Sequence, residues 1–541
     1  MRSNIRMKQA CLAACLWALC ACGGGSSGSS PAPSAPVPAP SPAPAPSPSP
    51  APSPSPAPSP APTPAPSPAP APGASLPFQG SVLLGAPTAS TVQFNLLSVV
   101  ETGQVRVRWA ASEAGPFTES AWQLLQADAP VVVSATGLAE ATAHVYQVQF
   151  QAAGDATVRS GPLNRFTTAR RAGQSFQFTV QADSHLDENA SVAQYQRTLS
   201  NVVADAPDFH VDLGDTFMTE KHSEPLSAVV QAAQDAATVN RRYAYERGQF
   251  ATISASVPLF LANGNHEGEL GWLNTGLSEI LPIWASQARQ RYFLNPRTPG
   301  FYSGDMQPEG SAGVRSAWYA WTWGDALFVV LDPFWNSKSQ ASKDPWSMSL
   351  GPVQYAWLQQ VLAGSKARFK LVFLHNLVGG LDGQMRGGIE AAPFYEWGGA
   401  NTDGTPGFAA RRPGWALPIH ALLKQHGVTA VFHGHDHVYV KQDLDGIVYQ
   451  AVPQPSAVNT NSGAQLARDY HYAAGTVQSS SGHLRCTVAA QFTCEYVRSW
   501  LPSAESATRV NREVADRWSV PAQSPQGPVS PLSAPPGRSG R

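Results

Sequence analysis

The residues of this sequence best suited to chemistry are acidic, imidazole and amide side chains that follow short apolar runs. They are Asp183, His185, Asp215, Asn265, His266, His375, His435 and His437. Such a mixture suits divalent metals such as Mn, Fe or Zn, whereas oxygen ligands alone suit Ca or Mg. Two cations held about 3.5–4 Å apart repel each other unless an anion lies between them, and Asp215 is the natural bridge. Two such metals lower the pKa of a shared water and bind the oxygens of a phosphoryl group during in-line displacement.

The order of these residues along the chain carries more information than any one of them. A lone histidine after a strand is more often a structural residue, and an isolated Gly-Asp pair is usually a turn. Here the polar residues recur at the ends of successive apolar runs, which turns alone do not explain. The most informative segments are 264–267 (Gly-Asn-His-Glu) and 434–437 (Gly-His-Asp-His).

The elements that must position these residues alternate between strands and helices. Buried strands are predicted at 176–182, 209–213, 259–262, 327–331, 370–374 and 429–432, and helices at 192–203, 353–362 and 418–426. The helices are predicted from apolar residues spaced three and four apart. This alternation favours a layered α/β core, in which ligands bind beyond the carboxyl ends of the strands.

A smaller region, 77–170, precedes this core and has a different pattern. Short alternating runs at 91–97, 104–109 and 145–150 are separated by turn residues, and no helical period is present. Evenly spaced short strands predict a β-sandwich. We expect it to pack against its neighbour; binding of carbohydrate or of a surface is the alternative.

The series of strand-end residues resembles the calcineurin-like metallophosphoesterase superfamily over 174–518. The resemblance implies a four-layer α/β/β/α fold and a metal-bridged hydroxide that attacks phosphorus in line. Asp183, His185 and His437 would bind the first metal, Asp215 would bridge, and Asn265, His375 and His435 would complete the second. His266 would face the leaving-group oxygen as a hydrogen-bond donor or general acid. Asp436 is expected to be structural, and His433 to orient a ligand from behind.

Region 77–170 resembles the fibronectin type III-like module that precedes the catalytic domain of purple acid phosphatases. Those enzymes owe their colour to a tyrosine three residues after the bridging aspartate, and Met218 occupies that position here. The first motif also has His185 where the purple enzymes usually carry a glycine. We therefore expect a member of the superfamily without the purple chromophore.

The N-terminal residues resemble a bacterial lipoprotein signal. Positive residues precede the short apolar run 10–19, which is too short to span a bilayer. Leu19-Cys20-Ala21-Cys22 is similar to a lipobox, so residues 1–21 would be removed and Cys22 would carry the lipid; an ordinary signal peptide is the alternative. Residues 22–76 contain Pro-Ala and Pro-Ser repeats typical of an extended spacer. A disordered tail is predicted at 519–541.

The remaining cysteines indicate a disulfide, and the overall charge and hydropathy argue against two classes of protein. Cys486 and Cys494 flank a possible hairpin, and in an oxidising compartment a disulfide between them would contribute roughly 2–3 kcal/mol. The 541 residues carry a net charge of -1 and 13% charged residues, which argues against specific nucleic-acid binding. The body of the chain contains no apolar stretch long enough to span a membrane.

The sequence thus predicts a dinuclear metal-dependent phosphoesterase, most simply a phosphatase, that is exported and lipid-anchored at the cell envelope. We expect the outer membrane, with the globular part in the periplasm or on the surface. A phosphodiesterase acting on nucleotides or cyclic nucleotides is a close alternative, and an inactive binding lipoprotein a more distant one. The substrate and the oligomeric state are not indicated. Charged residues in the insertions are interpreted as surface charges rather than phosphate ligands: Lys221, His222, Arg241, Arg242 and Arg386.

Overall fold

The computed structural model describes residues 76–186, 190–216, 235–337, 344–378, 386–458 and 462–522, all within one compact unit. The predicted signal, Cys22 and nearly all of the spacer lie outside the described residues, as do Met218, Lys221 and His222. The predicted tail, 519–541, lies outside them from residue 523 onward; the prediction of disorder is wrong for residues 519–521, because they end strand β22 (Val514–Pro521). Among the described residues, no helix has the length and apolar character needed to cross a membrane.

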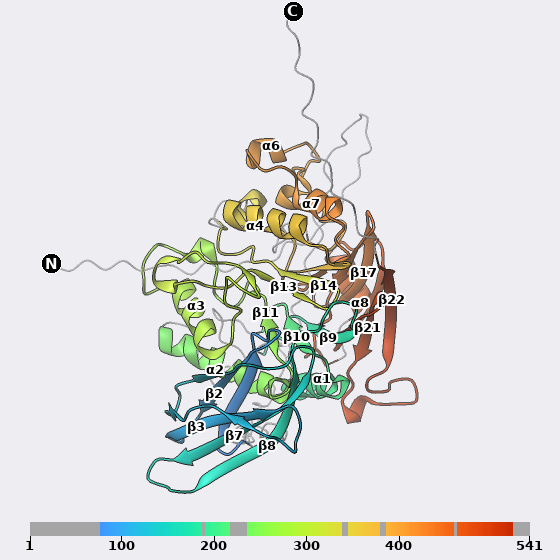
Figure 1. Ribbon diagram of the computed structural model, residues 1–541. Helices are drawn as coiled ribbons and strands as arrows, with labels where there is room; N and C mark the ends of the chain where they lie inside the picture. The colour runs from blue at the N-terminus through green and yellow to red at the C-terminus, as the bar shows by residue number, and fades with distance from the viewer. Residues whose placement is uncertain are drawn as a thin grey trace, which may run out of the picture. The chain divides into compact units, whose positions relative to one another are not determined.

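Three sheets organise the chain (Figure 1). The nine-stranded sheet has the order β22-β21-β20-β9-β10-β11-β1-β2-β6, and the eight-stranded sheet has the order β12-β13-β14-β15-β16-β18-β17-β19. The first contains β1 (Gly80–Gly85), β2 (Val92–Ser98), β6 (Val131–Ala135), β9 (Phe176–Gln181), β10 (Phe209–Asp212), β11 (Leu259–Leu261), β20 (Gly482–Val488), β21 (Gln491–Arg498) and β22 (Val514–Pro521). The second contains β12 (Ser303–Gly304), β13 (Tyr319–Trp323), β14 (Ala326–Val330), β15 (Phe369–Phe373), β16 (Ala430–His433), β17 (Tyr439–Leu444), β18 (Ile447–Ala451) and β19 (Thr476–Gln478).

The third sheet is five-stranded and lies in the N-terminal region. It contains β3 (Gly103–Ala110), β4 (Thr118–Glu119), β5 (Gln123–Leu125), β7 (Ala143–Ala152) and β8 (Val158–Thr167). The helices are α1 (Val192–Asp205), α2 (Ala236–Ser254), α3 (Leu281–Tyr292), α4 (Gly351–Gly364), α5 (Tyr395–Gly398), α6 (Phe408–Arg411), α7 (Ile419–Gln425) and α8 (Gly463–Asp469). Short 3-10 turns are η2 (Gly271–Leu273), η3 (Gly310–Ala312), η5 (Pro345–Ser347) and η6 (Pro502–Ala504).

The two larger sheets pack face to face and are covered by helices on their outer faces (Figure 1). Aromatic residues fill the space between the sheets; the rings of Phe178 and Phe328, for example, are 5.1 Å apart. Helices α1, α2 and α3 pack on the nine-stranded sheet, and α4 and α7 pack on the eight-stranded sheet. The predicted four-layer α/β/β/α fold is therefore confirmed.

The predicted strands and helices correspond closely to those of the structure. Helix α1 begins after Ser191, whose side chain accepts a hydrogen bond from the backbone of Gln194, and it ends at Ala206 in the left-handed conformation. Strands β9, β10 and β11 are parallel neighbours, as are β14, β15 and β16. Their carboxyl ends therefore meet at common sheet edges, where the predicted site residues follow.

The N-terminal region forms the predicted β-sandwich, with an apolar core between β1, β2 and β6 on one side and the five-stranded sheet on the other. Its sheet does not end at the sandwich. Strand β1 pairs in parallel with β11 at Gly85 and Leu259, so the sandwich and the α/β core share one sheet. The sequence predicts only that the sandwich packs against the α/β core. In the structure the two parts also pair through their backbones, because the unpaired edge of a strand can accept another strand.

Cys486 and Cys494 lie opposite each other on the antiparallel strands β20 and β21, and their sulfur atoms are bonded. Both cysteines are buried in the core between the sheets. The structure therefore places the cysteine pair in the hairpin that the sequence suggests.

A buried arginine of α2 also joins the sandwich to the core. Arg247 is 0% exposed and donates hydrogen bonds to the side chain of Ser81 (2.8 Å), to the side chain of Asn95 (2.9 Å) and to the carbonyl of Tyr292 (2.5 Å). A further bond reaches the carbonyl of Asn95 at 2.7 Å. One guanidinium thus satisfies oxygens of β1, of β2 and of the end of α3.

We expect Arg247→Met to lower the free energy of unfolding by about 3 kcal/mol or more, because buried oxygens left without a donor cost roughly 1–3 kcal/mol each. Denaturant unfolding, followed by circular dichroism and by tryptophan fluorescence, measures this change. The exposed Arg291, which donates to the carbonyl of Asp128, supplies the control: Arg291→Met should cost less than about 1 kcal/mol. Equal stability of the two variants would contradict the proposed role of Arg247.

Candidate metal centre

The structure brings most of the predicted metal ligands together in two groups. Asp183, His185 and His437 form one group, and Asp215, His375 and His435 form the other. Within each group, one potential ligand atom from every residue lies within 4.8 Å of the others. The residues come from loops that follow β9, β10, β15 and β16, which are the predicted strand ends.

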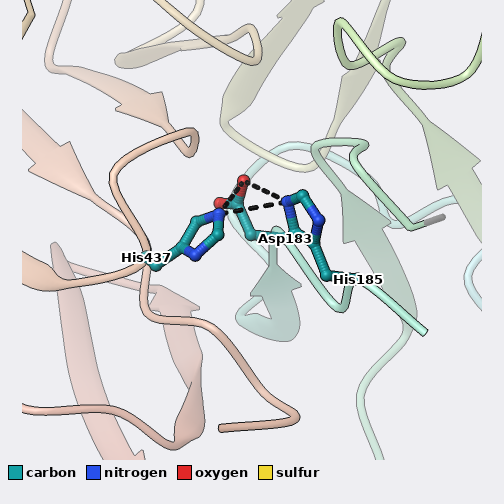
Figure 2. A group of neighbouring side chains, drawn as sticks. All are labelled: Asp183, His185 and His437. Atoms are coloured by element: carbon teal, nitrogen blue, oxygen red, sulfur yellow. Dashed lines mark hydrogen bonds and ion pairs between the residues drawn. The ribbon is translucent and has the colours of Figure 1, made fainter. Parts of the chain in front are cut away.

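The first group converges on the Asp183 carboxylate, as Figure 2 shows. The Nε2 atoms of His185 and His437 are 3.0 Å apart, and they lie 3.9 and 3.6 Å from Asp183 Oδ1. Asp183 and His185 are buried, whereas the His437 side chain is 32% exposed. One side of this group is therefore open to solvent.

The second group is buried and has one histidine tautomer defined by its surroundings. His375 Nδ1 lies 3.0 Å from the Leu213 carbonyl, which can only accept, so this nitrogen carries the hydrogen. Nε2, the atom with a lone pair in the neutral ring, lies 2.9 Å from Asp215 Oδ2. A backbone carbonyl that fixes the ring in this way is common behind metal-binding histidines.

Asp215 belongs to the second group and also lies close to the first. Its Oδ2 atom is 2.9 Å from Nε2 of His375 in the second group and 3.6 Å from Nε2 of His185 in the first. Its Oδ1 atom accepts a hydrogen bond from the backbone of His266 at 2.9 Å. This is the position that a bridging carboxylate requires.

Asn265 supplies a test of whether the site fits a cation. Its side-chain oxygen is buried and accepts no hydrogen bond from any residue that the structure describes. An unsatisfied buried oxygen costs roughly 1–3 kcal/mol, and coordination of a cation would remove that cost. Asn265 is not a member of either group, because those groups contain only histidines and aspartates, whereas the ligand atom of Asn265 would be an amide oxygen.

The backbone of the site is held in an uncommon conformation. Five of the predicted ligands are non-glycine residues with positive φ: Asp183 (62°), His185 (39°), Asp215 (54°), His435 (73°) and His437 (55°). Such conformations cost of order 1–3 kcal/mol each and persist only where the surrounding structure enforces them. Their concentration in one site is typical of functional sites.

Two glycines allow the backbone to approach the carboxylates closely. A Cβ atom on Gly434 would lie 2.6 Å from Asp183 Oδ2, and one on Gly264 would lie 2.2 Å from Asp215 Oδ1. Next to Gly434, the backbone N–H of His435 donates to both oxygens of Asp183, at 3.0 and 2.9 Å. A Cβ would also meet Ala182 Cβ at 2.7 Å from Gly434 and the Asp215 backbone nitrogen at 2.3 Å from Gly264, so lack of space rather than backbone conformation requires glycine at both positions.

Burial and the charges of neighbouring side chains together set the pKa values of the centre. It raises the pKa of Asp183 to about 7, against the opposing effect of His375. The pKa of Asp215 is well below its usual range despite burial, because His375 and His266 favour the carboxylate. Burial lowers the pKa values of His435 and His437 well below the usual range, which keeps both rings neutral, the form that binds metals. Two buried carboxylates beside the neutral imidazoles of His435 and His437 form a site that a cation would stabilise.

His266 lies beside the first group, with its ring centre 5.5 Å from that of His185. His433 is buried, and burial lowers its pKa. Asp436 faces away from the two groups, because its carboxylate accepts hydrogen bonds from Arg386 (2.9 Å) and Tyr472 (2.7 Å). This placement agrees with the structural role expected for Asp436.

Glu267 is a residue of the site to which the sequence pattern assigned no role. Its carboxylate accepts hydrogen bonds from the backbone of Thr216 at 3.0 Å and of Gly264 at 2.5 Å, so it joins the loops that carry Asp215 and Asn265. Burial raises the pKa of Glu267 to about 8. Its place within the segment 264–267 is the only signal in the sequence, and that signal does not separate a ligand from a positioning residue.

The interpretation of the charged insertion residues as surface charges is wrong for two of those described. Arg242 is 1% exposed, and Arg386 is bound to the segment 434–437. Arg241 is exposed and donates to Thr238 at 3.2 Å, as expected for a surface residue.

Comparison with known proteins agrees with this architecture. Residues 176–439 match the family model of the calcineurin-like phosphoesterases. The solved structure of PhoD has a TM-score of 0.57 and 16% identity, covering 83% of this chain and 93% of PhoD. A purple acid phosphatase from yellow lupin (Lupinus luteus) seeds has a TM-score of 0.54 and 14% identity, covering 84% of this chain and 77% of that enzyme. At such identities the likeness shows the fold. No curated protein matches the chain.

The fold and the two groups of ligands define a metal-dependent hydrolase that acts on phosphoric ester bonds. More specifically, residues 176–439 belong to the calcineurin-like metallophosphoesterase superfamily, as the sequence resemblance predicted. The likeness of the sandwich to fibronectin type III modules stays a prediction.

We expect Gly434→Ala to lower the affinity for Mn²⁺ at least about tenfold, the lower range found when groups that orient metal ligands are changed. The new methyl group would displace the Asp183 carboxylate, which it would otherwise meet at 2.6 Å. Isothermal titration of the metal-free protein measures the affinity. Gly248→Ala is the control, because a Cβ there meets nothing within 4 Å. If the two variants bound Mn²⁺ equally, the close approach would have no role in metal binding.

Proposed function

We propose that the protein is a dinuclear metal-dependent phosphatase of the cell envelope. The observation that carries the proposal is the position of Asp215, with Oδ2 within 2.9 Å of one group of ligands and 3.6 Å of the other. Asp183, His185 and His437 would hold one ion, and Asn265, His375 and His435 the other. When bound, the two ions would activate a water as nucleophile and neutralise charge on the phosphoryl oxygens.

The chain's own residues have separable roles in this proposal. Asp215 would keep two positive charges close together, because its carboxylate offers one anionic group to both. The Leu213 carbonyl holds the His375 ring with Nε2 toward Asp215. Glu267 fixes the loops of Asp215 and Asn265 relative to each other through two backbone N–H groups.

His266 is proposed as the proton donor to the leaving-group oxygen. Its backbone is anchored on Asp215, and its ring lies beside the first group without belonging to either group of ligands. A proton supplied there would neutralise the alkoxide as the phosphorus–oxygen bond breaks. The effect of His266 should therefore grow with the basicity of the leaving group.

The mixed ligand set supports Mn, Fe or Zn as the metals. The ligand expected to give a purple chromophore is a tyrosine at position 218, where the sequence has methionine. The envelope location rests on the lipobox-like residues that end at Cys22 and on the proline-rich spacer, both outside the described residues. A phosphoester small molecule is the proposed substrate.

Metal removal tests the proposal directly. Protein stripped with a chelator should lose hydrolysis of p-nitrophenyl phosphate, and reloading with Mn, Fe or Zn should restore it. Bis-p-nitrophenyl phosphate and nucleotides in the same assay distinguish a monoesterase from a diesterase. Lack of hydrolysis with every metal and substrate would favour an inactive binding protein.

Asp215→Asn should reduce kcat/KM at least about a thousandfold with the fold retained, because an amide offers no negative charge to bridge two cations. Asp403→Asn is the matched control, since Asp403 is exposed and its carboxylate bonds only Thr405 among the contacts described. Near-wild-type activity of Asp215→Asn would show that the bridging assignment is wrong.

His266→Asn should slow the hydrolysis of alkyl phosphates by about 10²–10⁴-fold, the usual range for general acid catalysis. Hydrolysis of p-nitrophenyl phosphate should slow far less, because p-nitrophenolate leaves without a proton. Rates over a series of leaving groups of increasing pKa measure the difference. The same loss for all esters would assign His266 to binding rather than to proton transfer.

A further inference from the structure

The segment 434–437 carries one proposed ligand for each metal, and its backbone conformation is unusual on both sides of Asp436. His435 has φ of 73° and His437 has φ of 55°. Neither is a glycine, so neither adopts this conformation without support from surrounding contacts. The support must come from groups that bind Asp436 and the backbone next to it.

Arg386 provides the central contacts. Its Nη2 atom donates to the His435 carbonyl at 2.6 Å, and its Nε atom donates to Asp436 Oδ1 at 2.9 Å. The guanidinium therefore binds the backbone of one proposed ligand and the side chain that separates the two. Its plane also lies over the Tyr470 ring, with Cζ 3.9 Å from the ring centre. Bidentate contacts of this kind define orientation as well as distance.

Two further side chains complete the support. The hydroxyl of Tyr472, which is buried, donates to Asp436 Oδ2 at 2.7 Å. The hydroxyl of Ser480 donates to the His437 carbonyl at 2.8 Å. The carbonyls of both strained histidines and both oxygens of Asp436 thus accept hydrogen bonds.

This support is itself attached to the eight-stranded sheet. Gln442 of β17 accepts from the backbone of Ile389 at 3.0 Å and donates to Glu390 at 2.9 Å. Glu390 in turn accepts from the backbone of Ala473 at 2.9 Å. The chain around Arg386 and the chain around Tyr472 are therefore joined through one residue of the sheet.

We propose that Arg386, together with Tyr472, is a positioning residue that holds His435 and His437 for two different metals and so sets the geometry of the pair. The inference rests on the proposed function, because it takes these histidines as ligands. The proposal assigns Arg386 no contact with the phosphoryl group; its Nε and Nη2 atoms are directed to the carboxylate of Asp436 and the carbonyl of His435.

The test is Mn²⁺ binding by the full chain, measured by isothermal titration, with electron paramagnetic resonance to detect coupling between two bound ions. Arg386→Ala should weaken binding about 10–100-fold, as changes to groups that orient metal ligands do, and should reduce the coupled signal. Arg386→Lys should not restore wild-type binding, because an ammonium lacks the planar pair of donors. Tyr472→Phe should weaken binding by a few-fold.

Arg412 offers a matched control. The side chains of Arg386 and Arg412 are 13% and 14% exposed, and each pairs with a buried carboxylate, Asp436 for the first and Glu396 for the second. Arg412 also donates to a backbone carbonyl, that of Trp346, at 2.6 Å. Arg412→Ala should lower the melting temperature about as much as Arg386→Ala does. Its affinity for Mn²⁺ should nevertheless stay within about twofold of that of the wild type.

Wild-type Mn²⁺ binding by folded Arg386→Ala would overturn the inference and leave the proposed function intact. Equal loss of binding in the Arg412 variant would also overturn it, since a general loss of stability would then be the cause. If Arg386→Ala did not fold, Tyr472→Phe, which removes one hydroxyl, would replace it in the test. Wild-type Mn²⁺ affinity of Tyr472→Phe would then overturn the inference. A wild-type protein that bound no pair of Mn²⁺, Fe²⁺ or Zn²⁺ ions would overturn the proposed function together with this inference.

Discussion

The structure depends on the close placement of two carboxylates, Asp183 and Asp215, whose side chains are both buried. Two buried negative charges at the same site are unfavourable unless cations or protons compensate them. The surrounding chain stabilises the two carboxylates in this position. Backbone N–H groups bind the carboxylate oxygens, glycines leave space beside them, and the imidazoles of both ligand groups lie next to them. The strained backbone of five predicted ligands is the conformational cost of that arrangement.

The layers of the fold supply the rigidity that such strain requires. Parallel strands from both larger sheets end at the site, and an aromatic core between the sheets fixes the sheets to each other. Strand β11, which precedes the loop of Asn265, has only three residues, Leu259–Leu261. It is supported on one side by β10 and on the other by β1 of the sandwich. The N-terminal region therefore contributes to the frame around the metal centre without lying in it.

The sequence was sufficient to predict the strands that lead to the site, because buried parallel strands are continuous apolar runs and their ends are marked by polar residues. It was not sufficient for α2, whose core-facing side buries Arg242, Glu246 and Arg247 among apolar residues and so obscures the helical period. The charge of Arg386 indicated a surface residue, since nothing in its local sequence identifies Asp436 as its partner. The pairing of β1 with β11 was also hidden, because it involves backbone groups that every residue carries.

The shared sheet has a consequence for how the enzyme could be produced or recombined. A shortened chain that began after the sandwich would leave β11 with an open edge, and an exposed row of unpaired backbone groups invites aggregation. Grafting the hydrolase onto another module would require a strand in the place of β1. The structural unit is then larger than the family match over 176–439, because the sandwich and the core share one sheet.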